Sequence, residues 1–174
     1  MISCFVSYSQ EQKVCGTTVD LRTEQLISDG LIPITKVFQN TSGADCTVCT
    51  YGGIIEYDKK NGFSKIKSEP NFHLIIANSN ITHSTESVVT DVKQFKEENE
   101  EEFSKLCNDE TKLVEDVLKL LKDNNIKELG KKIIQNQEYL ETIGVSNDKL
   151  RDMIQIAQKS SFGAKITGAG GGGC

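Results

Sequence analysis

The feature that most constrains the fold is a long block, Ser84 to Ser160, in which apolar residues recur at three- and four-residue intervals. This spacing puts the apolar side chains on one face and is typical of amphipathic helices. Asn124-Asn125 and Gly144 interrupt the pattern, as residues at helix ends do. The block therefore predicts four helices, the last of them capped by Ser146 or Asn147.

The region before this block predicts strands. Val19 to Leu31 is consistent with a helix, after which Tyr51 to Tyr57 forms an apolar run typical of a strand. Asp58 to Gly62 contains the asparagine and glycine of a hairpin turn, and Phe63 to Ile66 is the expected partner strand.

Two further strands are predicted in the second half of the chain. Phe72 to Asn78 is the clearest candidate for a buried strand, with Ile75 and Ile76 at its centre. Ala164 to Thr167 is a short candidate strand that leads into a glycine-rich end. Strands, a helical block and a final strand indicate an α+β fold, with helices on one face of an antiparallel sheet.

Composition excludes several classes of function. A net charge of -5 with a pI near 5.1 disfavours a nucleic-acid partner, since neutralising phosphates requires clustered Lys and Arg. No apolar run approaches the roughly 20 residues that span a bilayer, so no membrane partner is expected. Without a secretory signal at the amino terminus, the expected location is the cytoplasm. The acidic run Glu97 to Glu102 is expected to be a solvated helix start, with a partner-binding face as the alternative.

The six cysteines do not predict a metal site. They are scattered, and the single Cys46-Thr-Val-Cys49 motif lacks the second Cys or His pair that a zinc site needs. We expect these two cysteines to be small core residues and assign no metal ligand.

The glycine-rich end, Gly168 to Cys174, is the first segment with chemical meaning. Glycines allow backbone N–H groups to converge on an anion and permit positive φ. The segment is neither a phosphate-binding loop of the Walker A type nor a dinucleotide fingerprint, because it lacks the residues that follow in those motifs. An engineered tether ending in a reactive thiol is the simplest rival explanation.

The residues around this segment resemble a known family. Ala164-Lys-Ile-Thr-Gly-Ala-Gly-Gly-Gly-Gly-Cys174 is similar to the third signature motif of the mevalonate kinase family, in the GHMP kinase superfamily. Thr41-Ser-Gly-Ala-Asp45, followed by Thr50-Tyr-Gly-Gly53, resembles that family's Pro-Ser-Gly-x-Asp segment. Weaker similarity lies at Asn78 to Thr85 and at Gly130 to Leu150, which includes Asn136-Gln137. The order and spacing agree over roughly residues 40 to 174.

The resemblance implies a fold and a domain organisation. The fold would be the GHMP kinase carboxyl-terminal domain, ferredoxin-like but incomplete, in a chain truncated at both ends. Residues 1–40 would be a poorly matched remnant and residues 41–70 the end of the amino-terminal kinase domain with its hairpin. Residues 71–174 would be the carboxyl-terminal domain without its last strands.

The resemblance also implies an activity, the ATP-dependent phosphorylation of the C5 hydroxyl of mevalonate with Mg²⁺, and a homodimer in the full-length family. Asp45 falls on the family's catalytic carboxylate, which would accept or orient the proton of the attacking hydroxyl. A helix N-cap is the structural alternative for Asp45. The remaining implied contacts divide into a loop that supports the phosphates and a set of substrate contacts. The loop comprises Thr167, Gly168, Ala169, Gly170, Gly171, Gly172 and Gly173, and the substrate contacts comprise Ser42, Gly43, Ser84 and Thr85.

The sequence also departs from the family pattern. It contains no counterpart of the amino-terminal lysine segment or of the Pro-x-x-x-Gly-Leu-Gly-Ser-Ser-Ala loop that binds the ATP phosphates. The family's acidic Mg²⁺ residue corresponds here to Ile34, whose side chain offers no oxygen ligand. We therefore expect the chain alone to be inactive as a kinase. A catalytically inactive remnant or interaction module, or another GHMP kinase such as phosphomevalonate kinase, are the alternative functions.

Overall fold

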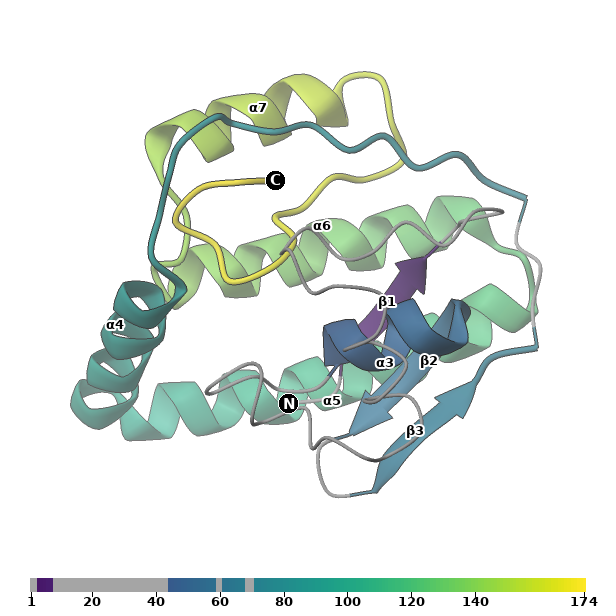
Figure 1. The fold of residues 1–174 in the computed structure, drawn as a ribbon, viewed down its shortest axis with the longest axis horizontal. Coiled ribbons are helices and arrows are strands. Elements are labelled where there is room, and N and C mark those ends of the chain that lie inside the picture. The colour runs from purple at the N-terminus through teal and green to yellow at the C-terminus, as the bar shows by residue number, and fades with distance from the viewer. Residues whose placement is uncertain (1–2, 8–43, 59–60, 68–70) are drawn as a thin grey trace, which may run out of the picture. The chain divides into compact units, whose positions relative to one another are not determined.

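The computed structural model describes residues 3–7, 44–58, 61–67 and 71–174 (Figure 1). The chain divides into two compact units, Met1–Ser68 and Glu69–Cys174. The predicted helix at Val19 to Leu31 lies outside the described residues. The three-part domain organisation expected from the family remains a prediction.

The first unit contains a three-stranded antiparallel sheet in the order β1-β2-β3. Its elements are β1 (Ser3–Ser7), α3 (Ala44–Tyr51), β2 (Gly53–Asp58) and β3 (Gly62–Lys65). The β2–β3 hairpin is confirmed, with Ile55 opposite Lys65 and Asp58 opposite Gly62. The Asp58 carboxylate accepts a hydrogen bond from the Asn61 N–H at 2.7 Å, which is the local bond expected in such a turn. Ile55 is fully buried and forms the centre of this unit with other apolar side chains of β2 and α3.

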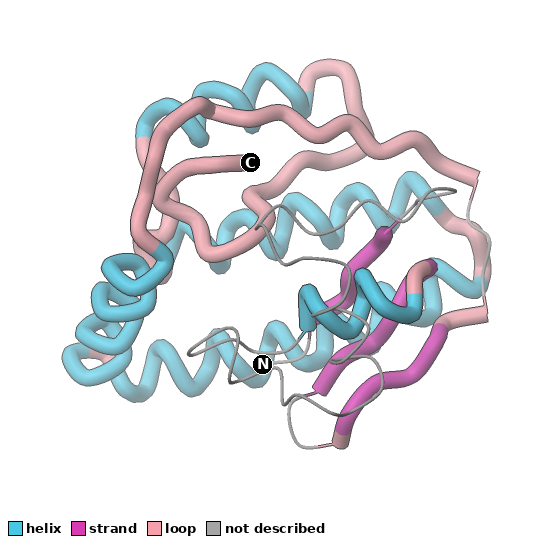
Figure 2. Tube along the Cα trace, in the orientation of Figure 1, coloured by secondary structure: helices cyan, strands magenta, loops and turns pink. Residues whose placement is uncertain are grey.

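The second unit contains the four predicted helices, in cyan in Figure 2. They are α4 (Thr85–Glu98), α5 (Glu100–Lys122), α6 (Ile126–Thr142) and α7 (Asp148–Gln158). The predicted caps are confirmed in detail: the Asn147 side chain, rather than Ser146, accepts from the Leu150 N–H, and α6 ends before Gly144, whose φ is +77°. Of the acidic run expected to start a helix, Glu100 to Glu102 form the first turn of α5, whereas Glu97 and Glu98 belong to the last turn of α4.

The core of the second unit joins three helices and the segment before the glycine-rich end. Its buried apolar residues are Leu113, Val114, Leu121, Leu129, Val145, Leu150 and Ile166. α5 and α6 pack along each other and are joined by two polar contacts between them. Lys132 Nζ donates to Asp116 at 2.9 Å, and Asn136 Nδ2 donates to Glu110 at 2.6 Å.

Two of the predicted strands do not form. Residues 72–78 are extended but pair with no strand among the described residues, and Ile75 and Ile76 are 93% and 78% exposed. Residues 164–167 are likewise outside any sheet. An apolar run becomes a buried strand only where a neighbouring backbone accepts its hydrogen bonds, and the described part of the second unit supplies no such neighbour.

The α+β class is nevertheless confirmed, with an antiparallel sheet and four long helices. Within the described residues, no helix combines the length and apolar character needed to cross a bilayer.

Candidate functional site

The glycine-rich segment, Thr167–Cys174, lies among the loops of the second unit. In Figure 1 it is the yellow trace that curls between α6 and α7 and ends at the carboxyl terminus. Hydrogen bonds place it beside the loop at residues 79–83 and beside the α6–α7 connection. Gly168, Gly170, Gly171 and Gly173 all have φ between +68° and +86°, a region that residues with side chains rarely adopt.

The inner half of the segment, Gly170 to Gly173, is held by backbone hydrogen bonds. The Gly171 N–H donates to the carbonyl of Val145 at 2.7 Å, and the Gly173 N–H donates to that of Ile81 at 3.2 Å. The Gly173 carbonyl accepts from the Ser79 N–H at 2.7 Å. These N–H groups are therefore used within the protein and do not face a ligand.

Close approach explains the glycines of this inner half. A Cβ atom at Gly172 would lie 2.5 Å from the Ile81 carbonyl oxygen and 3.1 Å from His83 Nδ1. One at Gly170 would overlap the Val145 carbonyl, and one at Gly171 would lie 2.8 Å from Val88 Cγ2. Gly170 and Gly172 are buried. Gly170 to Gly173 therefore form a packed support.

The outer half, Thr167 to Ala169, has a different environment. Thr167 and Gly168 are exposed, and a Cβ atom at Gly168 would meet nothing within 4 Å. In the described part of the chain, the N–H groups of Gly168 and Ala169 donate to no acceptor. Donors of this kind at a left-handed turn are the elements from which anion-binding nests are built. Of the predicted loop, this corner is the part that a ligand can approach.

Ser84 and Thr85 begin α4 close to the same loop. The Ser84 Oγ accepts from the Ser87 N–H at 3.4 Å and caps the helix, and Thr85 is its first residue. Both residues are exposed. They directly follow His83, whose ring lies against Gly172 and Gly173. The second unit thus brings the start of α4 to the glycine-rich segment, although substrate contact by Ser84 or Thr85 remains a prediction.

Sequence reasoning missed three residues at this site. Asn147 donates from Nδ2 to the Gly171 carbonyl at 2.9 Å, in addition to capping α7. Gln137 accepts from the Ile166 N–H, and His83 packs against the glycines. Each contact joins residues more than 20 positions apart, so no local pattern could have indicated it.

A half-buried carboxyl, that of Glu110, lies next to the helix that carries Gln137. Glu110 on α5 is half-buried, and this burial raises its pKa above the ordinary value of a glutamate. The hydrogen bond from Asn136 and the positive charge of Lys165 act in the opposite direction without cancelling it. Glu110 is thus tied to α6 through Asn136.

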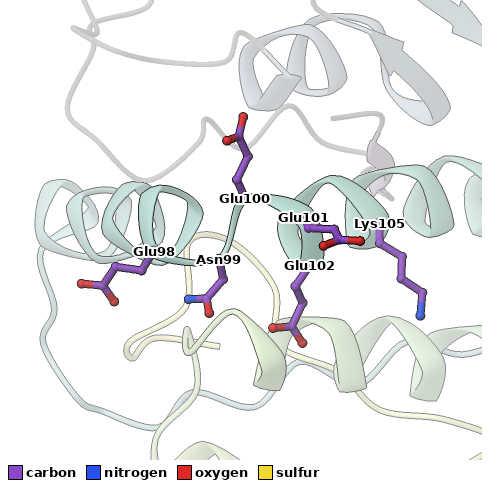
Figure 3. Close-up of a pocket in the computed structure, with 6 residues that line it drawn as sticks. All are labelled: Glu98, Asn99, Glu100, Glu101, Glu102 and Lys105. Atoms are coloured by element: carbon purple, nitrogen blue, oxygen red, sulfur yellow. The ribbon is translucent and has the colours of Figure 1, made fainter.

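The junction of α4 and α5 forms a surface pocket (Figure 3). Its lining consists of Glu98, Asn99, Glu100, Glu101, Glu102 and Lys105. In Figure 3 the carboxylates of Glu98, Glu100 and Glu102 point in different directions and do not converge on one point. An excess of negative charge disfavours phosphate, so this pocket is not part of the candidate site.

Comparisons with known proteins agree with this arrangement. Residues 117–174 match the family model described as GHMP kinases C terminal. The mevalonate kinase of Thermococcus onnurineus is 34% identical over 140 residues, which are 77% of this chain and 41% of that protein. The mevalonate kinase of Methanocaldococcus jannaschii is 32% identical over 171 residues, covering 89% of this chain and 49% of that protein. The resemblance to the mevalonate kinases is confirmed.

Solved structures show the same relationship. The structure of L. major mevalonate kinase in complex with R-mevalonate matches with a TM-score of 0.77 at 29% identity, over 87% of this chain and 48% of that one. The Methanococcus jannaschii mevalonate kinase matches with a TM-score of 0.72 at 28% identity, over 88% of this chain and 46% of that one. The chain spans about half the length of the mevalonate kinases that it matches.

Asp45, the predicted catalytic residue, belongs to the first unit. It is the second residue of α3, which begins at Ala44. The alternative role of Asp45 as an N-cap is therefore wrong, because a cap residue lies outside the helix with non-helical backbone angles. Ser42 and Gly43 lie outside the described residues.

The described residues do not by themselves supply a full set of protein ligands for Mg²⁺. Nowhere in the ranges that the structure describes do three His, Cys, Asp or Glu side chains gather in a way that could hold a metal ion. Ile34, which the resemblance places at the family's acidic ligand, lies outside those ranges. The phosphates of ATP fit better, since the N–H groups of Gly168 and Ala169 have no acceptor among the described residues and Gly168 is exposed.

Proposed function

We propose that this chain supplies the carboxyl-terminal part of the site of an ATP-dependent kinase that phosphorylates the C5 hydroxyl of mevalonate. The observation that carries the proposal is the division of the glycine-rich segment. A packed support, Gly170 to Gly173, holds an exposed corner, Thr167 to Ala169, in which the N–H groups of Gly168 and Ala169 have no acceptor in the described part of the chain.

The residues have distinct roles in this proposal. At the corner, the N–H groups of Gly168 and Ala169 donate hydrogen bonds to phosphate oxygens, where fixed N–H dipoles stabilise developing charge. The Thr167 N–H donates to the Cys174 carbonyl at 3.1 Å, so Thr167 contributes its side-chain hydroxyl. Asp45 accepts or orients the hydroxyl proton of mevalonate. Ser84 and Thr85 contact the substrate beside the loop. Cytoplasmic location, use of ATP with Mg²⁺, and a role in isoprenoid precursor synthesis belong to the same proposal.

A chimaera tests the activity. The chain is joined behind the amino-terminal half of the Methanocaldococcus jannaschii mevalonate kinase, and mevalonate-dependent ADP release is measured. We expect turnover in the chimaera and a loss of at least about 100-fold with Asp45→Ala, because proton transfer by a positioned group contributes roughly 10²–10⁴-fold. Asp152→Ala, on the exposed surface of α7, is the matched control and should leave turnover unchanged.

Three outcomes would contradict the proposal. Full activity of Asp45→Ala would remove that carboxylate from the mechanism. Faster turnover with phosphomevalonate than with mevalonate would favour the other kinase of the superfamily. An inactive chimaera that folds and binds no ATP would favour a remnant or interaction module, which the isoleucine at position 34 also suggests.

A further inference from the structure

Gln137 is a buried polar residue of α6, with only 5% of its surface exposed. Both ends of its side-chain amide are used. Oε1 accepts a hydrogen bond from the Ile166 N–H at 2.8 Å, and Nε2 donates to Glu141 Oε1 at 2.6 Å. Glu141 in turn accepts from Arg151 of α7 at 3.2 Å. This series of contacts fixes the orientation of the Gln137 amide.

The Ile166 N–H has the Gln137 oxygen as its hydrogen-bond acceptor. Ile166 is 1% exposed, so its N–H is shielded from water, and a buried N–H without an acceptor is strongly unfavourable. Residues 164–167 belong to no sheet, and the Gln137 oxygen is the acceptor that the described residues offer to this N–H. A side chain of α6 thus takes the place of a neighbouring strand.

Ile166 directly precedes the exposed corner, so the bond to its N–H affects where the corner lies. Thr167 and Gly168, which follow directly, form the exposed corner, and Gly170 to Gly173 are held separately by Val145 and Ile81. The corner therefore lies between two anchored segments, and the Thr167 N–H adds one hydrogen bond to the Cys174 carbonyl at 3.1 Å. Gln137 provides the anchor on its amino-terminal side.

We propose that Gln137 is the positioning residue of the glycine-rich segment: by holding the Ile166 N–H it sets where Thr167 and Gly168 present their backbone. The consequence for phosphoryl transfer rests on the proposed function, whereas the positioning role does not.

Hydrogen exchange of backbone amides, followed by NMR in the 174-residue chain, tests the role. Gln137→Met keeps the length of the side chain and removes both hydrogen bonds. We expect the exchange of the Ile166 and Thr167 amides to accelerate about ten-fold or more relative to the core amides of α5, as loss of a buried hydrogen-bond partner implies. Gln135→Met is the matched control on the same helix, because it removes a 2.7 Å bond to the Tyr139 hydroxyl without touching the loop.

A double variant that swaps the side chains at positions 137 and 141 should restore the hydrogen bond to the Ile166 N–H. In Gln137→Glu combined with Glu141→Gln, the carboxylate at 137 can accept from the Ile166 N–H, while the amide at 141 donates to it. We expect this double variant to restore slow exchange at Ile166. Equal acceleration of all amides in Gln137→Met, unchanged exchange at Ile166, or failure of the rescue would each overturn the positioning role.

A direct measurement keeps the test decisive if Gln137→Met does not fold. In the unaltered chain we expect a scalar coupling across the hydrogen bond, between the Ile166 amide nitrogen and the Gln137 side-chain carbonyl carbon, and its absence would overturn the proposal. In the chimaera, Gln137→Met should lower kcat about ten-fold and the double variant should recover it. If amide exchange at Ile166 responds to the substitutions as expected but the chimaera has no kinase activity, the result contradicts the proposed function and leaves the positioning role intact.

Discussion

The side chain of Asn147 binds two elements at once: its oxygen accepts from the Leu150 N–H at 3.0 Å, and its nitrogen donates to the Gly171 carbonyl at 2.9 Å. The residue that starts α7 is therefore also a support of the glycine-rich segment. Capping by asparagine follows from local rules, whereas the second bond spans 24 positions and exists only in the folded unit.

Substitutions of Asn147 should separate these two roles. Asn147→Ser retains a capping oxygen but loses the donor to Gly171, so we expect a loss of about 1 kcal/mol in the free energy of unfolding. Asn147→Ala loses both and should cost about 2 kcal/mol. Urea denaturation followed by circular dichroism measures both values. Asn125→Ser is the control, since Asn125 caps α6 through Glu128 N–H, and a change there as large as in Asn147→Ser would contradict the double role.

The two halves of the glycine-rich segment should tolerate different substitutions. At Gly168 only the positive φ of +76° opposes a side chain, so Gly168→Asn should cost less than about 1 kcal/mol, because asparagine adopts this region readily. At Gly172 the Ile81 carbonyl blocks any Cβ, and Gly172→Ala should cost about 1–3 kcal/mol. Denaturation curves of both variants give the comparison, and equal losses would refute the division into corner and support.

Replacing Gly130 by alanine should lower the stability of the chain, although alanine usually stabilises a helix. Helix propensity alone predicts that Gly130→Ala stabilises α6 by about 1 kcal/mol. A Cβ at this position would, however, overlap the backbone of Phe162, and a Cβ at Gly163 would overlap the backbone carbonyl of Gly130. We expect a net loss of about 1–3 kcal/mol in thermal or urea unfolding. Lys127→Ala, at an exposed position of the same helix, should change stability little, and a stabilised Gly130→Ala would disprove the close packing.

The contact between Asp116 and Lys132 should make the α5–α6 pairing depend on pH. The hydrogen bond from Lys132, with its charge, lowers the pKa of Asp116 below its ordinary value. A carboxyl with a lowered pKa in the folded state stabilises at pH values above its unfolded pKa of about 3.9, and this contribution disappears as the pH falls through the folded value. Lys132→Gln should therefore reduce the unfolding midpoint at neutral pH but not under strongly acidic conditions.

The matched control for this pH dependence is Lys131→Gln. Lys131 pairs with Glu128 on the exposed surface of a single helix, so its loss should change the midpoint little at any pH. A difference between Lys132→Gln and the unaltered chain that persists at pH values well below the folded pKa of Asp116 would contradict the assigned origin.

Much of the helical unit could be predicted because its signals are local. Apolar spacing marked the four helices, while Ser84, Asn147 and Gly144 marked ends that depend on the backbone within four residues. The hairpin between β2 and β3 followed equally from the turn residues between them. The run at residues 72–78 was misjudged because apolar composition measures the preference for burial, not the presence of a neighbouring strand.

The sequence by itself determined the helices, the hairpin and the similarity of the glycine-rich segment to the mevalonate kinases. The tertiary structure alone decided which glycines serve packing and which form an exposed corner. It also decided that Gln137 and Asn147 hold this segment, through contacts 29 and 24 residues apart. The physical reason is that the partner of a buried N–H or carbonyl is fixed only when distant segments meet, whereas a cap or a turn is satisfied by its own neighbours.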